Sequence, residues 1–298
     1  MQLEATGRLE VIGLLINEAC RACGLTRKAV EYYCEQGLIS PFVAENGYRR
    51  FSEREIAQLK KIAVLRGLGV SVPDIRTCLG GDGARAIRRI IGRRENEIEA
   101  LREKQALLRQ FMETQDWDAV QEQLGAINAK QAILDRLLAA FPGYYGKFLA
   151  VHFARFLGEP LRTASQSEAF DTVCAFLDGV QLAIPADMQD YLDDLLENWD
   201  SPVMQEATEN LSAAIKDPGR YFHEHRDMIE QYQMLASSEA YKATPAYRFK
   251  ELVRRFNAEE GYDDVFLPAM GRLSPAYREY REALEAADTI FAELMENG

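Results

Sequence analysis

The residues best placed to do chemistry lie between positions 15 and 79, where basic and aromatic side chains recur at helical spacing. Thr26, Arg27 and Lys28 open one such segment, which carries Tyr32 and Tyr33 on its later turns. Hydroxyl, guanidinium and ammonium groups in the first turn of a helix can reach base edges and phosphates in the major groove of DNA. The segment therefore predicts contact with a duplex.

A hairpin and a further helix are predicted to carry the remaining basic groups. Two short strands, residues 38–43 and 46–51, surround an Asn-Gly turn and form a wing. Ser52 is the predicted N-cap of the next helix, because Glu53 and Glu55 occupy its first turn. The side chains expected to contact DNA from these elements are Tyr48, Arg49, Arg50, Lys60 and Arg66.

Short helices must hold these groups in place. The first is predicted over residues 17–23 with Gly24 as its break, and Thr26 is the N-cap of the second, which ends at Gly37. Another begins near Val72 and Pro73 and ends before the paired glycines at 80 and 81. This order of helix, four-residue turn, helix and wing is typical of a winged helix-turn-helix.

The same side chains also have an ordinary structural interpretation. Arginine and lysine on a helix most often belong to a solvated face, and Tyr32 and Tyr33 could fill the core of a small domain. The DNA-binding interpretation is favoured because several independent elements agree in order and spacing.

In this order the motifs resemble the MerR family of bacterial transcription regulators, over roughly the first quarter of the chain. The matching segments are residues 16–19, 24–26, 32–39, 46–52 and 65–71, and residues 1–13 precede the usual start of the family. The resemblance implies a homodimer that binds double-stranded promoter DNA, distorts it when an effector binds, and so acts indirectly on RNA polymerase. Glu31 stands where many members have arginine, which shifts the expected phosphate contacts towards Arg27 and Lys28.

Downstream of the double glycine, a long helix is predicted to carry an apolar edge. Its positions alternate in steps of four and three residues, with Arg94 and Gln105 at two of them. An ordinary amphipathic helix packed within its own domain is the alternative. The resemblance implies instead an antiparallel pairing with a second copy, which suits a two-fold DNA site. The predicted dimerisation residues are Ile87, Ile91, Ile98, Leu101, Leu108 and Met112.

Charge divides the chain unevenly. The 298 residues include 35 Lys and Arg against 47 Asp and Glu, a net charge of −12. Residues 1–110 carry 19 basic and 14 acidic side chains, whereas residues 111–298 carry 16 and 33. A duplex repels such an acidic region, so we expect it to lie away from DNA and to have another role.

The length allows more than one domain. We expect a DNA-binding domain over residues 1–80, a dimerisation helix over 82–115 and a regulatory domain over 116–298. No apolar run long enough to span a bilayer and no signal peptide is recognised, and five cysteines without a paired framework favour a reducing cytoplasm. Cys20 and Cys23 are better explained as small core residues than as metal ligands.

From Trp117 onward the pattern predicts helices, separated by proline- and glycine-containing breaks. The fold class is therefore mostly α: a winged helix-turn-helix with a short β wing, a long antiparallel coiled-coil helix and an all-α C-terminal domain. The expected helical segments are residues 118–140, 144–158, 165–180, 186–198, 203–216, 219–236, 245–258 and 275–296.

The role of the helical domain is the open part of the prediction. Its many aromatic residues could line a cavity for a lipophilic or cationic small molecule, through stacking and cation–π contacts. They could equally fill the core, and the domain could instead dock a protein partner. The expected effector-binding residues are Tyr144, Tyr145, Phe148, His152 and Trp199.

Little in the sequence favours catalysis. His223 and His225 are two residues apart, so on one helix they point to different faces and are poor joint metal ligands. No nucleophile elbow, phosphate loop or dinucleotide motif is present. We expect no enzyme activity, no cofactor and no metal site.

Overall fold

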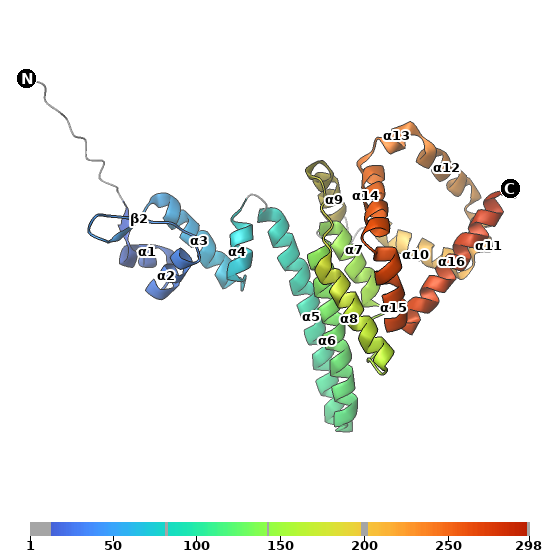
Figure 1. Cartoon of the computed structure of the whole chain (residues 1–298), viewed down its shortest axis with the longest axis horizontal. Coiled ribbons are helices and arrows are strands. Elements are labelled where there is room, and N and C mark those ends of the chain that lie inside the picture. Colours follow the sequence, from blue (N-terminus) through green and yellow to red (C-terminus); the bar gives the residue numbers. More distant parts are fainter. Residues whose placement is uncertain (1–12, 81–82, 142, 198–201, 297–298) are drawn as a thin grey trace, which may run out of the picture. The chain divides into compact units, whose positions relative to one another are not determined.

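The computed structural model describes residues 13–80, 83–141, 143–197 and 202–296 (Figure 1). These residues form two compact units, which divide between Ile90 and Ile91. The boundary falls inside one long helix, α5 (Gly83–Thr114), so each unit contains part of it. None of the helices in the described residues is long and apolar enough to cross a membrane.

The first unit contains short helices and a small sheet. In chain order its elements are β1 (Leu14–Leu15), α1 (Ile16–Cys23), α2 (Arg27–Glu35), β2 (Phe42–Val43), β3 (Arg49–Phe51), α3 (Glu53–Gly67), α4 (Val72–Cys78) and the start of α5.

Local sequence explains where its helices begin and end. Thr26 Oγ1 accepts a hydrogen bond from the Ala29 amide, and Ser52 forms a reciprocal capping box with Glu55. Gly24 adopts a positive φ of 65° at the end of α1, a conformation that costs a residue with a Cβ free energy. The predicted caps Thr26 and Ser52 are therefore confirmed.

The sheet has three antiparallel strands in the order β1-β3-β2. β3 is central, with Leu14 opposite Phe51 on one side and Phe42 opposite Arg50 on the other. The wing strands are shorter than predicted, because Leu38 and Ile39 lie in the core instead of in a strand. The β1 strand was not predicted at all.

Among the described residues of the second unit, helices are the only regular secondary structure. After α5 it contains α6 (Trp117–Ala140), α7 (Gly143–Ala154), α8 (Ala164–Gly179), α9 (Ala186–Glu197), α10 (Pro202–Lys216), α11 (Pro218–Glu224), α12 (Arg226–Ser237), α13 (Glu239–Lys242), α14 (Pro245–Glu259), the π-helical turn η1 (Tyr262–Phe266), α15 (Leu267–Leu273) and α16 (Pro275–Glu296). The predicted mostly α fold, with its small wing, is confirmed.

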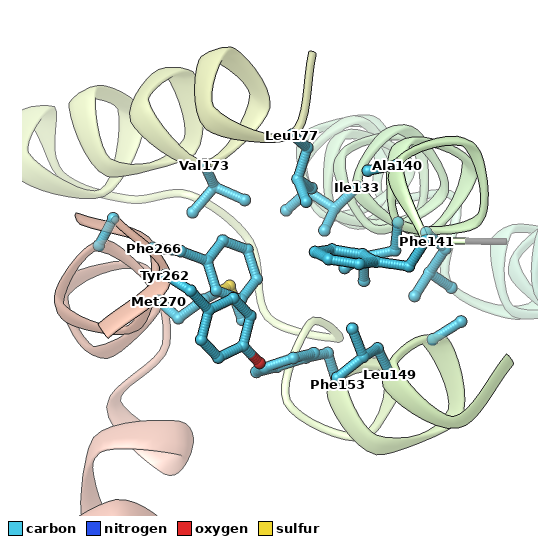
Figure 2. Close-up of a cluster of buried hydrophobic side chains, with 14 of the residues drawn as sticks. Ile133, Ala140, Phe141, Leu149, Phe153, Val173, Leu177, Tyr262, Phe266 and Met270 are labelled. Carbon is cyan, nitrogen blue, oxygen red and sulfur yellow. The ribbon is translucent and has the colours of Figure 1, made fainter. Parts of the chain in front are cut away.

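The core of this unit lies between α6, α7, α8 and the η1–α15 segment (Figure 2). Phe141, at the end of α6, faces Phe266 and Tyr262 across it. The Phe141 and Tyr262 rings meet edge to face with centroids 6.4 Å apart, a favoured aromatic arrangement. Phe153 of α7 makes a similar edge contact with Phe266 at 5.3 Å.

Two helical predictions for this unit were wrong in detail, and one helical region was missed. The segment 144–158 ends earlier, at Ala154, and the segment 219–236 is two helices that meet at His225. The region 262–273 was not predicted as helix, yet it supplies the buried Tyr262, Phe266 and Met270.

Candidate nucleic-acid interface

The start of α2 presents the predicted reading residues to solvent. Thr26, Arg27 and Lys28 are exposed, while Val30 on the opposite face is fully buried in the core of the first unit. Arg27 Nε donates a hydrogen bond to Glu31 at 2.9 Å, which raises the pKa of the guanidinium further. Because an exposed ion pair is weak, Arg27 can exchange Glu31 for a phosphate at little cost.

The tyrosine pair divides between surface and core. Tyr32 is 43% exposed, whereas Tyr33 is 5% exposed and packs in the core of the first unit. The two ring centroids are 6.0 Å apart. The expectation that Tyr33 contacts DNA is therefore corrected: successive helical residues point in different directions, and its ring is used to hold α2 in place.

The wing presents an aromatic ring and a guanidinium group at its tip. Gly47 has a φ of 79°, and the Tyr48 amide donates to Asn46 Oδ1 at 3.1 Å, which closes the turn. Tyr48 and Arg49 are exposed. Arg50 is half-buried and donates to the Gly13 carbonyl at 3.2 Å, so it also fastens the segment that precedes β1.

The two predicted residues of α3 differ in role. Lys60 is exposed to solvent. Arg66 donates to the Val70 carbonyl at 2.6 Å, which satisfies a backbone acceptor in the link between α3 and α4. Arg66 is thus at least partly a structural residue.

Two positioning contacts were not anticipated from the sequence. Gln58 Nε2 donates to the Leu38 carbonyl at 2.6 Å and joins α3 to the segment before the wing. Arg76 of α4 donates to the Gln36 carbonyl at the end of α2. Both contacts join residues at least 20 positions apart, so no local pattern could have indicated them.

The cysteines of the first unit are poorly suited to metal binding as they stand. Burial raises the pKa of Cys20 and Cys23, so both thiols are protonated at neutral pH. Cys23 Sγ donates to the Ile56 carbonyl at 3.7 Å and belongs to the core. Within the described ranges, no cluster of three or more His, Cys, Asp and Glu residues is arranged to hold an ion.

The apolar edge of α5 is open. The six predicted dimerisation residues are exposed by 44% to 79%: Ile87, Ile91, Ile98, Leu101, Leu108 and Met112. The opposite face of α5 in the second unit is covered, since Ala100 and Leu107 are buried and Glu103 pairs with Lys130 of α6 at 2.7 Å. Packing within its own domain therefore explains one face of α5. It does not explain the other face, which carries the regular apolar edge.

Three of the predicted effector residues, Tyr145, Phe148 and His152, make consecutive ring contacts along α7, with the Tyr145 and Phe148 centroids 6.4 Å apart. Tyr145 is buried in the core, where burial raises its pKa to about 12, and this corrects the prediction that it binds an effector. Tyr144 is half-buried, and Phe148 is exposed beside His152 with ring centroids 6.2 Å apart. Trp199 lies outside the described residues.

His152 is surrounded by aromatic rings that already contact a cation, the guanidinium of Arg155. Its ring packs near those of Phe156 and Tyr280, at 5.6 and 5.5 Å. The guanidinium of Arg155 lies over both of these rings, at 4.7 and 4.8 Å. Burial, and then the charge of Arg155, lowers the pKa of His152 to about 4. The cation–π position next to His152 is thus occupied by the chain's own arginine.

The comparisons with known proteins concern the first unit. Residues 14–81 match the family model described as "MerR HTH family regulatory protein". Similar curated proteins include the HTH-type transcriptional regulator HmrR of Rhizobium leguminosarum bv. viciae, 39% identical over 64 residues, and the HTH-type transcriptional regulator CueR of Salmonella typhi, 32% identical over 60. The matched regions cover 22% and 20% of this chain, and 50% and 44% of those proteins. The chain thus spans about half the length of the curated relatives it matches.

Proposed function

We propose that this protein is a DNA-binding transcription regulator, because residues 14–81 match the MerR helix-turn-helix family model. It binds a two-fold promoter element as a homodimer, and its helical unit responds to an effector. The observation that carries the proposal is the first turn of α2, where Thr26, Arg27 and Lys28 are exposed while Val30 beneath them is buried.

Two elements supply the DNA contacts in this proposal. The first turn of α2 enters the major groove and reads base edges, with Tyr32 beside it. The wing, through Tyr48 and Arg49, and the exposed Lys60 of α3 neutralise phosphates. Arg50 and Arg66 keep their backbone contacts and contribute mainly by holding the wing and the α3–α4 link.

The dimer of the proposal uses the open apolar edge of α5. Six exposed apolar residues in heptad register form a stripe that a second copy can cover by knobs-into-holes packing. A two-fold dimer presents two copies of α2 to successive half-sites, which is the geometry that helix-turn-helix proteins require.

The effector of the proposal is a lipophilic or cationic small molecule. Another similar protein is named "Heavy metal-dependent transcription regulator 2", from Rhizobium meliloti (strain 1021), and is 35% identical over 65 residues. This chain has no cysteine between Leu79 and Val173, the stretch that contains all of α5, so thiolate binding of a metal there is disfavoured. Effector binding would help to bend and untwist the promoter, which costs a few kcal/mol, and so bring polymerase recognition sites into register.

The experiment is a footprint and a salt titration of binding by the full chain on its promoter. Lys28→Ala and Arg49→Ala should each weaken binding on every sequence and lower the salt slope by about one. Lys216→Ala, which removes the same charge from the exposed end of α10, is the matched control and should leave both quantities unchanged. Full protection of the promoter by both variants would contradict the proposal.

One observation favours a second candidate, in which the helical unit docks a partner protein. The α12 helix has no buried residue, and Met228, Tyr232 and Leu235 expose an apolar stripe on it. A thermal-shift panel on the full chain separates the two functions. Stabilisation by small molecules favours the effector, and stabilisation only by amphipathic peptides favours the docking function.

A further inference from the structure

A cavity of about 190 Å³ lies between α5, α6 and α7 of the second unit. Its walls are mostly apolar and include Ala100 of α5, Leu134 and Leu138 of α6, and Val151 and Ala154 of α7. An apolar cavity of about 150 Å³ is large enough to bind benzene. The volume therefore suits one six-membered ring with a short substituent.

The rim of this cavity is charged. Glu95, Glu99 and Glu103 follow one another at intervals of four on α5, so they share one face of the helix. Lys147 approaches Glu95 at 3.8 Å, and Lys130 binds Glu103 at 2.7 Å. Arg102 pairs with the third carboxylate, Glu99, so a ligand cation binds at this rim by displacing one of three basic side chains.

Glu99 is the rim carboxylate whose ion pair is the most exposed to solvent. Its ion pair within α5 is to Arg102, at 3.3 Å, and both side chains are largely exposed. An ion pair of this kind contributes little, so a ligand cation can replace the guanidinium. An apolar ring inside the cavity would place its cationic substituent at this carboxylate.

The cavity lies next to the apolar edge that is proposed to form the dimer. Glu99 and Ala100 line it, and the residues on either side of them in the sequence, Ile98 and Leu101, belong to the open apolar edge. The cavity and the edge are thus two faces of the same two turns of α5. A ligand that changes the packing of α5 on α6 acts on the helix that presents the dimer contacts.

We propose that this cavity is a binding site for a small aromatic monocation, and that it is the effector site of the regulator. The assignment as the effector site rests on the proposed function, whereas the binding of an aromatic monocation does not. The site differs from the expected one: α7 contributes Lys147, Val151 and Ala154 to it, and not the predicted Tyr144, Phe148 and His152.

The test uses three probes of similar size on the full chain, without DNA. They are benzyltrimethylammonium, benzyl alcohol and benzenesulfonate, which are cationic, neutral and anionic, and binding is followed by calorimetry and thermal shift. We expect the cation to bind best and the anion worst. Equal binding of all three, or binding of none, would overturn the proposal.

Variants locate the site. Glu99→Gln should weaken benzyltrimethylammonium by about two- to five-fold, the value of a partly exposed charge pair, and should leave benzyl alcohol unchanged. Glu113→Gln, an exposed glutamate of α5 outside the cavity, is the matched control. Ala154→Leu fills the cavity and should abolish binding of both ligands. Because Glu99 is exposed, its variant keeps the test valid even if the filled variant folds poorly.

Failure of the binding site and failure of the proposed function give different results. Absence of promoter binding by the wild-type chain, together with binding of the cation, would overturn the regulator and keep the site. Promoter binding without binding of the cation would do the reverse. If the cation binds but leaves the promoter footprint unchanged, the site stands and its role as the effector site is refuted.

Discussion

Leu101→Asp tests whether the open edge of α5 pairs two copies of the chain. Leu101 is 65% exposed, at the middle of the apolar edge, so the substitution removes no contact of the core. It places a carboxylate where the proposed dimer has a leucine. The variant should therefore fold normally and dissociate.

The magnitude follows from the exposed fraction. Full burial of a leucine side chain is worth about 1.5–3 kcal/mol, so covering the exposed part of Leu101 gains roughly 1–2 kcal/mol on each protomer. A two-fold dimer contains the residue twice, which gives about 2–4 kcal/mol, or roughly a 30- to 900-fold rise in the dissociation constant. This is a lower limit, because the aspartate also loses hydration in the interface.

The assay is sedimentation velocity over a concentration series, with circular dichroism as the check on folding. Gln110→Asp introduces the same charge on an exposed position of α5 outside the edge, and should dimerise as the wild type does. A Leu101→Asp dissociation constant within about three-fold of wild type would refute the pairing through this edge. Promoter binding by the variant should weaken in parallel, since each monomer then meets a single half-site.

Three further predictions concern the stability of the helical unit. Burial lowers the pKa of His152 from 6.5 to about 4, so as the pH falls the unfolded state binds this proton at a higher pH than the folded state does. The free energy of unfolding should therefore be unaffected above pH 6.5 and fall by up to about 3 kcal/mol towards pH 4. Chemical denaturation across that range measures the loss, which His152→Gln should reduce and the exposed His223→Gln should not. Burial raises the pKa of Asp135, so the fold disfavours its charge; Asp135→Asn should stabilise the protein at neutral pH, with the gain fading in acid, and a gain independent of pH would contradict this cause. Gly92→Ala and Gly146→Ala should change the melting temperature in opposite directions. A Cβ at Gly92 meets Leu138 at an ordinary 3.6 Å, so the variant should gain about 1 kcal/mol of helix propensity. A Cβ at Gly146 would overlap the Phe141 carbonyl, so that variant should lose about 3 kcal/mol or more of stability.

The features that could be predicted from the sequence are those with local causes. Thr26 and Ser52 cap their helices through hydrogen bonds to residues three positions later in the chain. The caps and the helices that follow them can therefore be predicted from the local sequence. The same holds for the wing turn, where Asn46 and Gly47 supply the required conformations. The apolar edge of α5 is another local pattern, and its exposure agrees with its heptad spacing.

The features that could not be predicted depend on distant partners. Leu14 and Leu15 form a strand only because β3 lies beside them, and two residues carry no periodicity. Tyr262 and Phe266 follow an exposed, acidic-looking segment, and their place in the core depends on Phe141 and Phe153. The cavity also depends on tertiary packing, since the consecutive helices α5, α6 and α7 must pack imperfectly against one another to leave it.

The energetics of regulation are compatible with a modest effector. Promoter distortion costs a few kcal/mol, and a ligand shifts an equilibrium only by its difference in affinity for the two states. A two-fold dimer contains two equivalent sites, so a ten-fold preference at each provides about 2.8 kcal/mol in total. A fragment-sized cation with weak absolute affinity can meet this requirement if it binds one arrangement of α5 better than the other. Selective binding by the distorted complex, and not tight binding by the free protein, is therefore the property that an inducer of the proposed regulator must have.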